Sequence, residues 1–459
     1  MISSLIDDLR AIVGAEHVLT DDRARDKYAS DGTRHYHRPD LIVLPDGADQ
    51  VSAVVGICAR DRLPIVPRGA GTGYSGGAVP IQGGVVLSLE RMHRILEIDQ
   101  ANLLAIVEPN VVTGDLQDAV ERVGLFYPPD PASLRQSVIG GNVAESAGGP
   151  RAFKYGTTKQ YVLGLQAVLP TGEIITTGGK VVKNVAGYDL TQLLVGSEGT
   201  LAIITRITLR LIPLPAARLT LRATFAAVAD AAHAVDRIVA ERVVPAALEL
   251  IDADSLDAIA RHLGGRPLAP GGTAALVLIE VDGTPEAAAE DAVRVERACR
   301  ASGATEVLRA RTAAERDDLW RVRRELSPAL RTLAPVKFNN DIVVPKGRIP
   351  ELFDLIARLR ADQGVRIACF GHAGDGNIHV NVMVGESEDE LRRARETVRV
   401  LFEGVLALEG SITGEHGIGL SKAPYLSMQL GADEIALMQR VKRAFDPHGI
   451  LNPGKIFRN

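Results

Sequence analysis

The sequence predicts an α+β protein with more than one domain, and three observations support this fold class. The chain has 459 residues, which is more than one small hydrophobic core usually spans. Between residues 41 and 211, short apolar runs such as PIVPRG, GGVVLSL and LGLQAVLP alternate with glycine-rich turns, a pattern typical of strands. After Pro213 and Pro215, strand and helix patterns alternate, which predicts a second α/β domain with an antiparallel sheet.

These changes of pattern divide the chain into four parts. Residues 1–35 are charged and helical, 36–215 form a first domain, 216–420 a second domain, and 421–459 a C-terminal segment. Apolar residues at helical spacing predict helices over 48–60, 113–123, 227–241, 284–302, 312–333, 347–363, 386–409 and 431–445.

The composition excludes several classes of protein. The net charge of −5 argues against a nucleic-acid surface, because phosphate binding usually needs a basic stripe. Cys58, Cys299 and Cys369 form no CxxC pair, so we expect no iron–sulfur cluster and a reducing compartment. The amphipathic N-terminus is unlike a secretory signal, and no long uncharged apolar run predicts a membrane span. We expect a cytoplasmic protein and leave open its association with the inner face of the membrane.

The glycine-rich stretch PRGAGTGYSGG at 67–77 is the first candidate binding motif. It contains Gly71-x-Gly73-x-x-Gly76, the spacing of a dinucleotide-binding loop. That loop requires a helix directly after the glycines, and about eight residues here precede the next strand pattern, so no crossover helix fits. The remaining interpretations are a tight structural turn, or a turn whose successive backbone N–H groups bind phosphate.

Further segments follow this loop in a fixed order. They are YPPDPAS at 127–133, IGGN at 139–142, AESAGG at 144–149, Tyr155-Gly156 and GSEGTLAII at 196–204. Together they resemble the FAD-binding half of the vanillyl-alcohol oxidase / p-cresol methylhydroxylase superfamily over residues 40–215. The resemblance implies FAD bound between two α+β subdomains.

The same resemblance implies a set of cofactor-binding residues. The loop would hold the pyrophosphate, the segments at 129–146 would line the path of the phosphates and the flavin, and those at 198–203 would lie near the adenosine. These residues are Pro67, Arg68, Gly69, Ala70, Gly71, Thr72, Gly73, Tyr74, Pro129, Asp130, Ser133, Gly140, Gly141, Asn142, Ser146, Gly156, Glu198, Gly199 and Ile203. Relatives with covalent flavin often have histidine at the position of Thr72, so we expect non-covalent FAD.

The second candidate motif contains His372 and His379, with Glu415 and His416 about 35 residues further on. Two histidines and one carboxylate can bind a divalent metal and leave coordination positions open. The spacing of seven with glycines between suits a turn that enters a strand, so His379 and Asn381 would share a strand face. The alternative is that each histidine is an ordinary surface or core residue.

This half of the chain resembles the FAD-linked oxidase C-terminal domain of D-2-hydroxy-acid dehydrogenases. The resemblance implies that His372, His379 and Glu415 bind a divalent metal, that His416 is the catalytic base and that Asn381 hydrogen-bonds substrate. Zinc, manganese and iron all suit such ligands. A 2-hydroxy acid could chelate the metal, and a neutral histidine could accept its hydroxyl proton.

Arg323 and Lys337 are candidates for binding the substrate carboxylate. The spacing of Arg323 from Trp320 matches the position of a substrate-binding arginine in relatives, although the arginines of 316–331 could also be a solvated helix face. Relatives for larger diacids carry lysine where this chain has Asn339. The tail NPGK at 452–455 also resembles the family, which implies that residues 421–459 return to the FAD-binding domain and that Asn452 faces the isoalloxazine. Asn-Pro-Gly could instead be a turn.

The runs KNVAGYDLT at 183–191 and KYGTT at 154–158 are most similar to the large-subunit group of bacterial glycolate oxidases. This likeness implies oxidation of glycolate or D-lactate to the 2-oxo acid by hydride transfer to flavin. Electrons would leave to a quinone, a cytochrome, a flavoprotein or additional glycolate-oxidase-type subunits, and a homodimer stays open. The alternatives are a D-2-hydroxyglutarate-type dehydrogenase, an alkyl-dihydroxyacetone-phosphate synthase-like enzyme, a sugar-acid oxidase and a flavin-binding subunit without chemistry.

Overall fold

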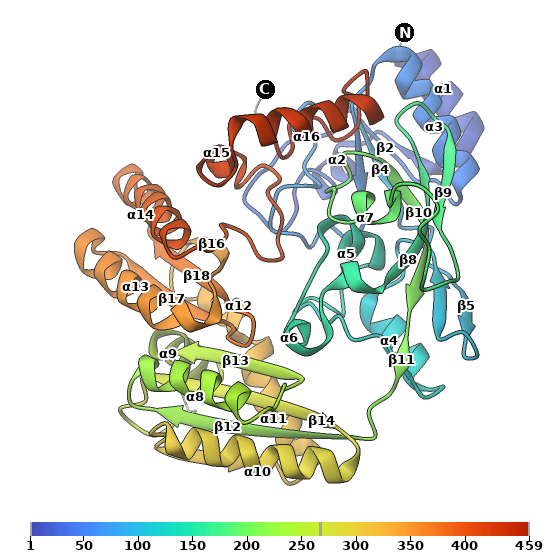
Figure 1. Ribbon diagram of the computed structural model, residues 1–459. Helices are drawn as coiled ribbons and strands as arrows, with labels where there is room; N and C mark the ends of the chain where they lie inside the picture. The colour runs from blue at the N-terminus through green and yellow to red at the C-terminus, as the bar shows by residue number, and fades with distance from the viewer. Residues whose placement is uncertain (1, 266–268, 458–459) are drawn as a thin grey trace. The chain divides into compact units, whose positions relative to one another are not determined.

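The computed structural model describes residues 2–265 and 269–457, which form two compact units (Figure 1). Unit 1 contains Met1–Gly148, Thr157–Leu214 and Glu415–Asn459; unit 2 contains Gly149–Gly156 and Pro215–Gly414. The second unit therefore ends at Gly414, whereas the sequence predicted that the second domain ends at residue 420. No helix in the described part of the chain is both long and apolar enough to cross a bilayer.

Residues 149–156 belong to unit 2 although the sequence pattern assigned them to the first domain. They contain the short helix α6 (Ala152–Tyr155). The Lys154 ammonium pairs with the buried Asp282 carboxylate, and the Tyr155 hydroxyl donates to the same side chain at 2.7 Å. These polar contacts explain the assignment, because a buried carboxylate needs such donors to be tolerated.

The first sheet of unit 1 has the strand order β1-β2-β4-β3. Its strands are β1 (Val18–Leu19), β2 (Leu41–Val43), β4 (Val85–Ser88) and β3 (Ile65–Arg68). Helices α1 (Ile2–Val13) and α3 (Ala48–Asp61) pack their apolar faces into its core, with Leu9, Val51 and Val55 fully buried. The short α2 (Asp22–Lys27) is capped by Asp21, whose carboxylate accepts the Ala24 N–H.

Strands β3 and β4 are parallel neighbours, and residues 69–84 connect them without a helix. Parallel neighbours are usually joined by a crossover helix. Its absence here confirms the strand, turn, strand prediction and rules out a Rossmann loop at Gly71–Gly76. The connection is instead an irregular loop whose backbone groups are not used up by helical hydrogen bonds.

The second sheet of unit 1 is antiparallel throughout. In spatial order its strands are β5 (Ile95–Asp99), β6 (Leu104–Val107), β10 (Ile203–Arg210), β8 (Val162–Val168) and β9 (Ile174–Gly178). The edge strands β5 and β9 carry mostly half-buried or exposed residues and gave no clear strand signal in the sequence. Strands β7 (Leu125–Phe126) and β11 (Ile212–Pro213) form a separate pair.

Short helices complete unit 1. They are α4 (Thr113–Glu121), α5 (Ile139–Glu145), α7 (Leu190–Leu194), α15 (Leu426–Gln429) and α16 (Ala432–Phe445). The C-terminal residues bind back to the first sheet, because the Asn452 N–H donates to the Ile65 carbonyl at 2.7 Å. The segment after residue 420 therefore packs within unit 1.

Unit 2 is built on a seven-stranded antiparallel sheet, as the sequence predicted for the second domain. In spatial order its strands are β15 (Glu306–Arg309), β12 (Ala217–Phe225), β14 (Ala275–Gly283), β13 (Ala247–Asp252), β17 (Arg366–His372), β18 (Asn377–Val384) and β16 (Val336–Val343). Helices cover both faces of this sheet, so the strands β13, β14, β17 and β18 are almost continuously buried.

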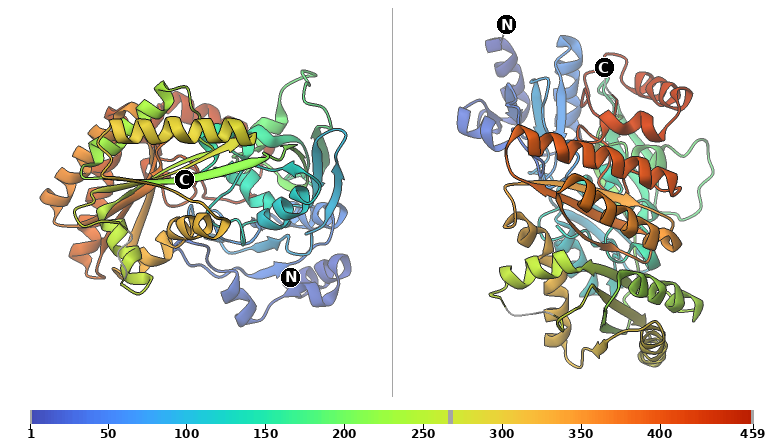
Figure 2. Two further views of the ribbon diagram at one scale, coloured as in Figure 1. Left: turned by 90° about the horizontal axis from the view of Figure 1, so that it is seen from below. Right: turned by 90° about the vertical axis from the view of Figure 1, so that its left-hand side faces the viewer.

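The two helical layers of unit 2 lie on opposite sides of the sheet, as α10 and the pair α11–α12 show most clearly (Figure 2). One layer contains α8 (Val228–Ala240), α10 (Pro285–Ala301), α13 (Ile349–Gln363) and α14 (Glu388–Ala407). The other contains α9 (Ala253–His262), α11 (Ala313–Arg324) and α12 (Leu326–Arg331), which share one apolar cluster with Ile251 and Phe370.

The single helix predicted over 312–333 is wrong, because α11 ends at Arg324 and α12 begins at Leu326. Pro328 explains the break. A proline inside a continuous helix would clash with the carbonyl four residues earlier, whereas the first turn of a new helix tolerates it. The break places Trp320 and Arg323 of α11 against the strand face that carries the polar groups described below.

Candidate active site

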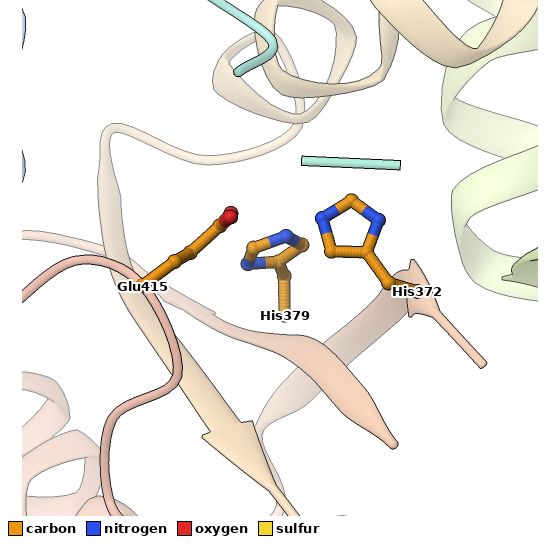
Figure 3. Close-up of side chains that lie close together, drawn as sticks. All are labelled: His372, His379 and Glu415. Carbon is orange, nitrogen blue, oxygen red and sulfur yellow. The ribbon is translucent and has the colours of Figure 1, made fainter. Parts of the chain in front are cut away.

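His372, His379 and Glu415 bring their ligand atoms within 4.8 Å of one another (Figure 3). His372 ends β17 and His379 lies in β18, so the two histidines belong to one hairpin. In the sheet register, His379 lies opposite both Phe370 and Asp341, which places these side chains on one face. The turn that enters a strand, predicted from the spacing of the histidines, is confirmed.

Glu415 is held through the residue before it. The Gly414 N–H donates to the carboxylate of Asp341 at 2.9 Å and to its backbone carbonyl at 2.9 Å. Asp341 is fully buried in β16. Gly414 is the last residue of unit 2 and directly precedes Glu415. Strand β16, whose Asp341 lies opposite His379, therefore also fixes the backbone position from which the Glu415 side chain starts.

Glu249 of β13 orients His372, and the sequence analysis missed it. Its carboxylate hydrogen-bonds His372 Nδ1 and pairs with Arg323 Nε. Burial opposes the charge on Glu249, but the positive charges of Arg323 and His372 outweigh it and lower the pKa to about 2. A lone glutamate in the apolar run AALELID was the signal that could have identified it.

The donor set fits a divalent transition metal. Metal-binding histidines usually give one ring nitrogen to the metal while the other donates to a carboxylate, as His372 does to Glu249. Two imidazoles and one carboxylate leave coordination positions open for a substrate. The residues present therefore suit zinc, manganese or ferrous iron.

Arg323 is buried behind His372 and is not part of a solvated helix face. Its Nε pairs with Glu249, and its guanidinium lies 4.8 Å from the centre of the Phe370 ring. The neighbouring Arg321 and Arg324 are exposed. Arg323 therefore has a supporting partner that the sequence did not predict, in addition to its expected role in binding a carboxylate.

Asn381 shares a strand face with His379, as predicted. Its Nδ2 donates to the carbonyls of Ala368 and His379, at 3.2 and 3.1 Å. Its buried Oδ1 has no hydrogen-bond partner within the described residues. The same holds for the Oδ1 of Asn339, which lies directly opposite Asn381 on β16. Buried amide oxygens of this kind usually have an acceptor role toward a ligand or water.

Lys337 lies further along the same face of β16, opposite Met383. Its ammonium donates to the Ser327 hydroxyl at 3.0 Å. Burial, with the nearby Arg331 charge, lowers the pKa of Lys337 to about 8. The structure thus brings Lys337 together with Ser327, and Lys337 precedes Asp341 by four positions in the sequence.

His416 follows Glu415 directly, and its Nε2 lies 4.0 Å from Glu415 Oε1. Its ring stacks on Tyr74 with the centroids 5.4 Å apart. Tyr74 belongs to the glycine-rich loop, so this loop and His416 meet within unit 1. The sequence had assigned Tyr74 only a backbone role.

The glycine-rich loop has the features of an anion-binding nest. The backbone N–H groups of Gly69 to Gly73 make no hydrogen bond to the described part of the chain. Gly71 has φ +69°, and a Cβ there would overlap the guanidinium of Arg68, which lies beneath the loop. Successive N–H donors above a buried arginine fit a pyrophosphate.

Several other predicted cofactor residues gather beside this loop. Asn452 Nδ2 donates to the carbonyls of Gly77 and Glu198, and a Cβ on Gly199 would lie 2.9 Å from Pro67 Cγ. Asn142, by contrast, donates to Thr113 Oγ1 at 2.7 Å, and Ile203 packs in the core of the first sheet. The remaining residues lie along loops and α5; they are Ala70, Thr72, Pro129, Asp130, Ser133, Gly140, Gly141, Ser146 and Gly156.

Comparison with known proteins gives both halves of the chain a family. Residues 214–456 match the family of FAD linked oxidases, C-terminal domain, and residues 39–178 match the FAD binding domain family. The chain is 43% identical over 453 residues to the glycolate oxidase subunit GlcD of Bacillus subtilis (strain 168), covering 98% of this chain and 96% of that protein.

A D-lactate dehydrogenase of Anaerostipes hadrus is 38% identical over 456 residues, covering 97% of this chain and 94% of that protein. The crystal structure of p-cresol methylhydroxylase with substrate bound shares the fold, with a TM-score of 0.81 at 19% identity over 100% of this chain and 97% of that one. These matches confirm the predicted family of FAD-linked oxidases and the predicted fold. The chain belongs to the FAD-linked oxidases and is an FAD-dependent oxidoreductase.

Proposed function

We propose that this enzyme oxidises a small 2-hydroxy acid, glycolate or D-lactate, to the 2-oxo acid. The observation that carries the proposal is the cluster of His372, His379 and Glu415 with His416 as the next residue. A bidentate hydroxy acid matches a metal site with open positions and an adjacent base. The names of the relatives, a glycolate oxidase subunit and a D-lactate dehydrogenase, support the same substrate class.

His372, His379 and Glu415 would hold a divalent metal, which would supply Lewis acidity to the substrate hydroxyl and carboxylate. Glu249 keeps His372 in the tautomer and orientation that a ligand needs. Asn381 offers its buried Oδ1 as an acceptor, and Arg323 offers charge behind the cluster. These side chains bind and orient the hydroxy acid.

His416 Nε2 or Nδ1 would accept the hydroxyl proton. A neutral imidazole can do so near pH 7. Tyr74 restrains the ring by stacking, so the base does not have to be ordered during the reaction. FAD, when bound, supplies the hydride acceptor.

FAD would be bound non-covalently along unit 1. Gly69 to Gly73 would hold the pyrophosphate through their N–H groups, with Arg68 beneath. Asn452 would contact the flavin ring with its buried Oδ1, which has no partner in the described residues. Electrons would then pass to a quinone, a cytochrome, a flavoprotein or an additional subunit.

Asn339 supports a small substrate over a diacid. Its neutral amide stands where relatives for larger diacids carry lysine, and its buried oxygen lies opposite Asn381. A neutral amide at this position offers no ammonium charge to pair with a second carboxylate. The site therefore favours glycolate or D-lactate over D-2-hydroxyglutarate.

The test is anaerobic reduction of the purified yellow protein by a panel of 2-hydroxy acids, followed by flavin absorbance. Glycolate or D-lactate should bleach the flavin, and D-2-hydroxyglutarate should do so less efficiently. Bleaching by L-lactate alone would contradict the stereochemical assignment, and no bleaching by any 2-hydroxy acid would contradict the proposed function.

A further inference from the structure

Glu198 is a buried carboxylate whose hydrogen bonds lead to the loop that carries His416. It is 6% exposed and adopts φ +53° in the turn before β10. One carboxylate oxygen accepts the N–H of Ile418 at 2.7 Å, and the other accepts the N–H of Gly419 at 2.6 Å. A carboxylate with a separate N–H on each oxygen fixes both the position and the orientation of the backbone that it binds.

Gly417 shows how closely this carboxylate approaches the loop. A Cβ atom on Gly417 would lie 2.9 Å from Glu198 Oε1 and would overlap the carboxylate of Glu145. The backbone there has φ +81°, which a side chain would disfavour even without the crowding. The residue directly after His416 is thus enclosed by two acidic side chains.

The far end of the loop has its own anchor. The N–H groups of Leu420 and Ser421 both donate to the Ser75 carbonyl, at 2.7 and 3.0 Å. On the near side, His416 stacks on Tyr74, the residue before Ser75. Between these two attachments, Glu198 supplies the charged hydrogen bonds to residues 418 and 419.

Glu198 lies near backbone donors and two lysines, yet its pKa is raised above the ordinary glutamate value. Burial raises the pKa of the carboxyl, while the two backbone N–H donors and the charges of Lys422 and Lys455 act in the opposite direction. The Glu198 carbonyl accepts from Asn452 Nδ2 at 2.9 Å, so its backbone is held as well. Both carboxylate oxygens are therefore directed into the protein, to the 418–419 backbone.

We infer that Glu198 is a positioning residue for His416, and that its carboxylate does not bind FAD. This inference rests on the proposed function, in which His416 is the base. The glutamate of the Gly-Ser-Glu-Gly stretch is thereby assigned to the catalytic loop, whereas the sequence had placed it beside the adenosine. Loss of its two hydrogen bonds should free the backbone two residues after the base.

The test compares Glu198→Gln with the wild-type enzyme in three measurements. The amide of glutamine replaces one acceptor with a donor that faces an N–H group. We expect the rate constant of anaerobic flavin reduction to fall about 100-fold, as a misplaced catalytic group commonly costs. The Kd of FAD should change less than threefold, and the pH at which reduction is half-maximal should shift.

Hydrogen exchange separates this inference from the proposed function. In Glu198→Gln, the amides of Ile418 and Gly419 should exchange faster while the rest of unit 1 keeps its protection. This measurement does not depend on which substrate reduces the flavin. Unchanged exchange at 418–419, or a rise of more than tenfold in the Kd of FAD, would overturn the inference.

Glu108→Gln is the matched control. Glu108 is also a buried carboxylate of unit 1, and it accepts the Arg94 N–H at 2.7 Å and the Arg94 guanidinium. Its loss should lower stability without slowing flavin reduction. If Glu198→Gln does not fold, Glu198→Asp, which keeps two charged acceptors, is used in the same four measurements, hydrogen exchange included. Wild-type reduction with faster exchange at 418–419 would overturn the inference.

Discussion

The two units build their binding groups from different parts of the polypeptide. Unit 1 offers backbone N–H groups from Gly69 to Gly73, in a loop between two parallel strands. Unit 2 offers side chains from adjacent strands of one sheet, with His372, His379 and Glu249 on a shared face. The difference teaches that the proposed phosphate site depends on backbone conformation, whereas the proposed metal and substrate site depends on the identity of side chains.

Removing a metal ligand should produce the largest effect and should leave the FAD-binding loop of unit 1 intact. His379→Ala removes one of the three ligands, so we expect metal content well below one equivalent and flavin reduction slower by at least about 1000-fold. FAD content should stay normal because the loop of unit 1 is untouched. Metal analysis and absorbance spectra measure both quantities.

His233→Ala is the control for this variant, because His233 is an exposed histidine of unit 2. It should leave metal content and reduction unchanged. Full metal occupancy in His379→Ala would contradict the assignment of the ligands.

Glu249→Gln should weaken metal binding without removing a ligand. The loss of the carboxylate that orients His372 should lower metal affinity by about 10–100-fold. It also leaves Arg323 buried without its partner, so stability should fall by about 3–5 kcal/mol. Competition with a chelator measures the affinity, and denaturant unfolding measures the stability.

Glu280→Gln sharpens this prediction. Glu280 lies on the same sheet face and accepts from Trp320 Nε1 at 2.9 Å and Thr220 Oγ1 at 3.0 Å, and neither partner is a histidine. It should lower stability and keep metal affinity. Equal metal loss in both variants would mean that Glu249 acts through general packing only.

In unit 1 the corresponding change is Gly71→Ala. The added Cβ displaces the guanidinium of Arg68, and a side chain strains the backbone at φ +69°. We expect the Kd of FAD to rise about tenfold or more, with metal content unchanged, as measured by flavin fluorescence and metal analysis. Gly47→Ala, where a Cβ meets nothing within 4 Å, should leave both unchanged.

Asn339→Lys should change specificity more than rate. An ammonium opposite Asn381 replaces an acceptor with a charge that attracts a second carboxylate. We expect the ratio of kcat/KM for D-2-hydroxyglutarate to that for D-lactate to rise about tenfold, which corresponds to about 1.4 kcal/mol. An unchanged ratio would show that residue 339 does not face the substrate.

The last prediction concerns the pH dependence of stability. Because burial lowers the pKa of Lys337 to about 8, the unfolded chain binds more protons than the folded one between that pH and the ordinary lysine pKa of about 10.4. The free energy of unfolding therefore increases as pH rises through this window. Lys337→Met should abolish this increase, which amounts to at most about 3 kcal/mol. Denaturant unfolding at pH 7.5 and 10 measures it.

The sequence predicted those features whose signal is local. The missing helix after Gly76 and the spacing of His372 and His379 each depend on a few adjacent residues. The break before Leu326 was missed because helical periodicity continued through Pro328. Glu249, Asp341 and Glu198 act on partners far along the chain, so only the folded sheet and loops could reveal that each carboxylate supports a catalytic segment.

The most direct measurement is flavin reduction by D-lactate in metal-replete and metal-free protein under anaerobic conditions. Our account predicts that D-lactate or glycolate bleaches the flavin in the replete enzyme, that removal of the metal stops bleaching while FAD stays bound, and that added metal restores it. Complete and rapid bleaching in metal-free protein would contradict the central claim that His372, His379 and Glu415 hold the metal that orients the substrate for oxidation.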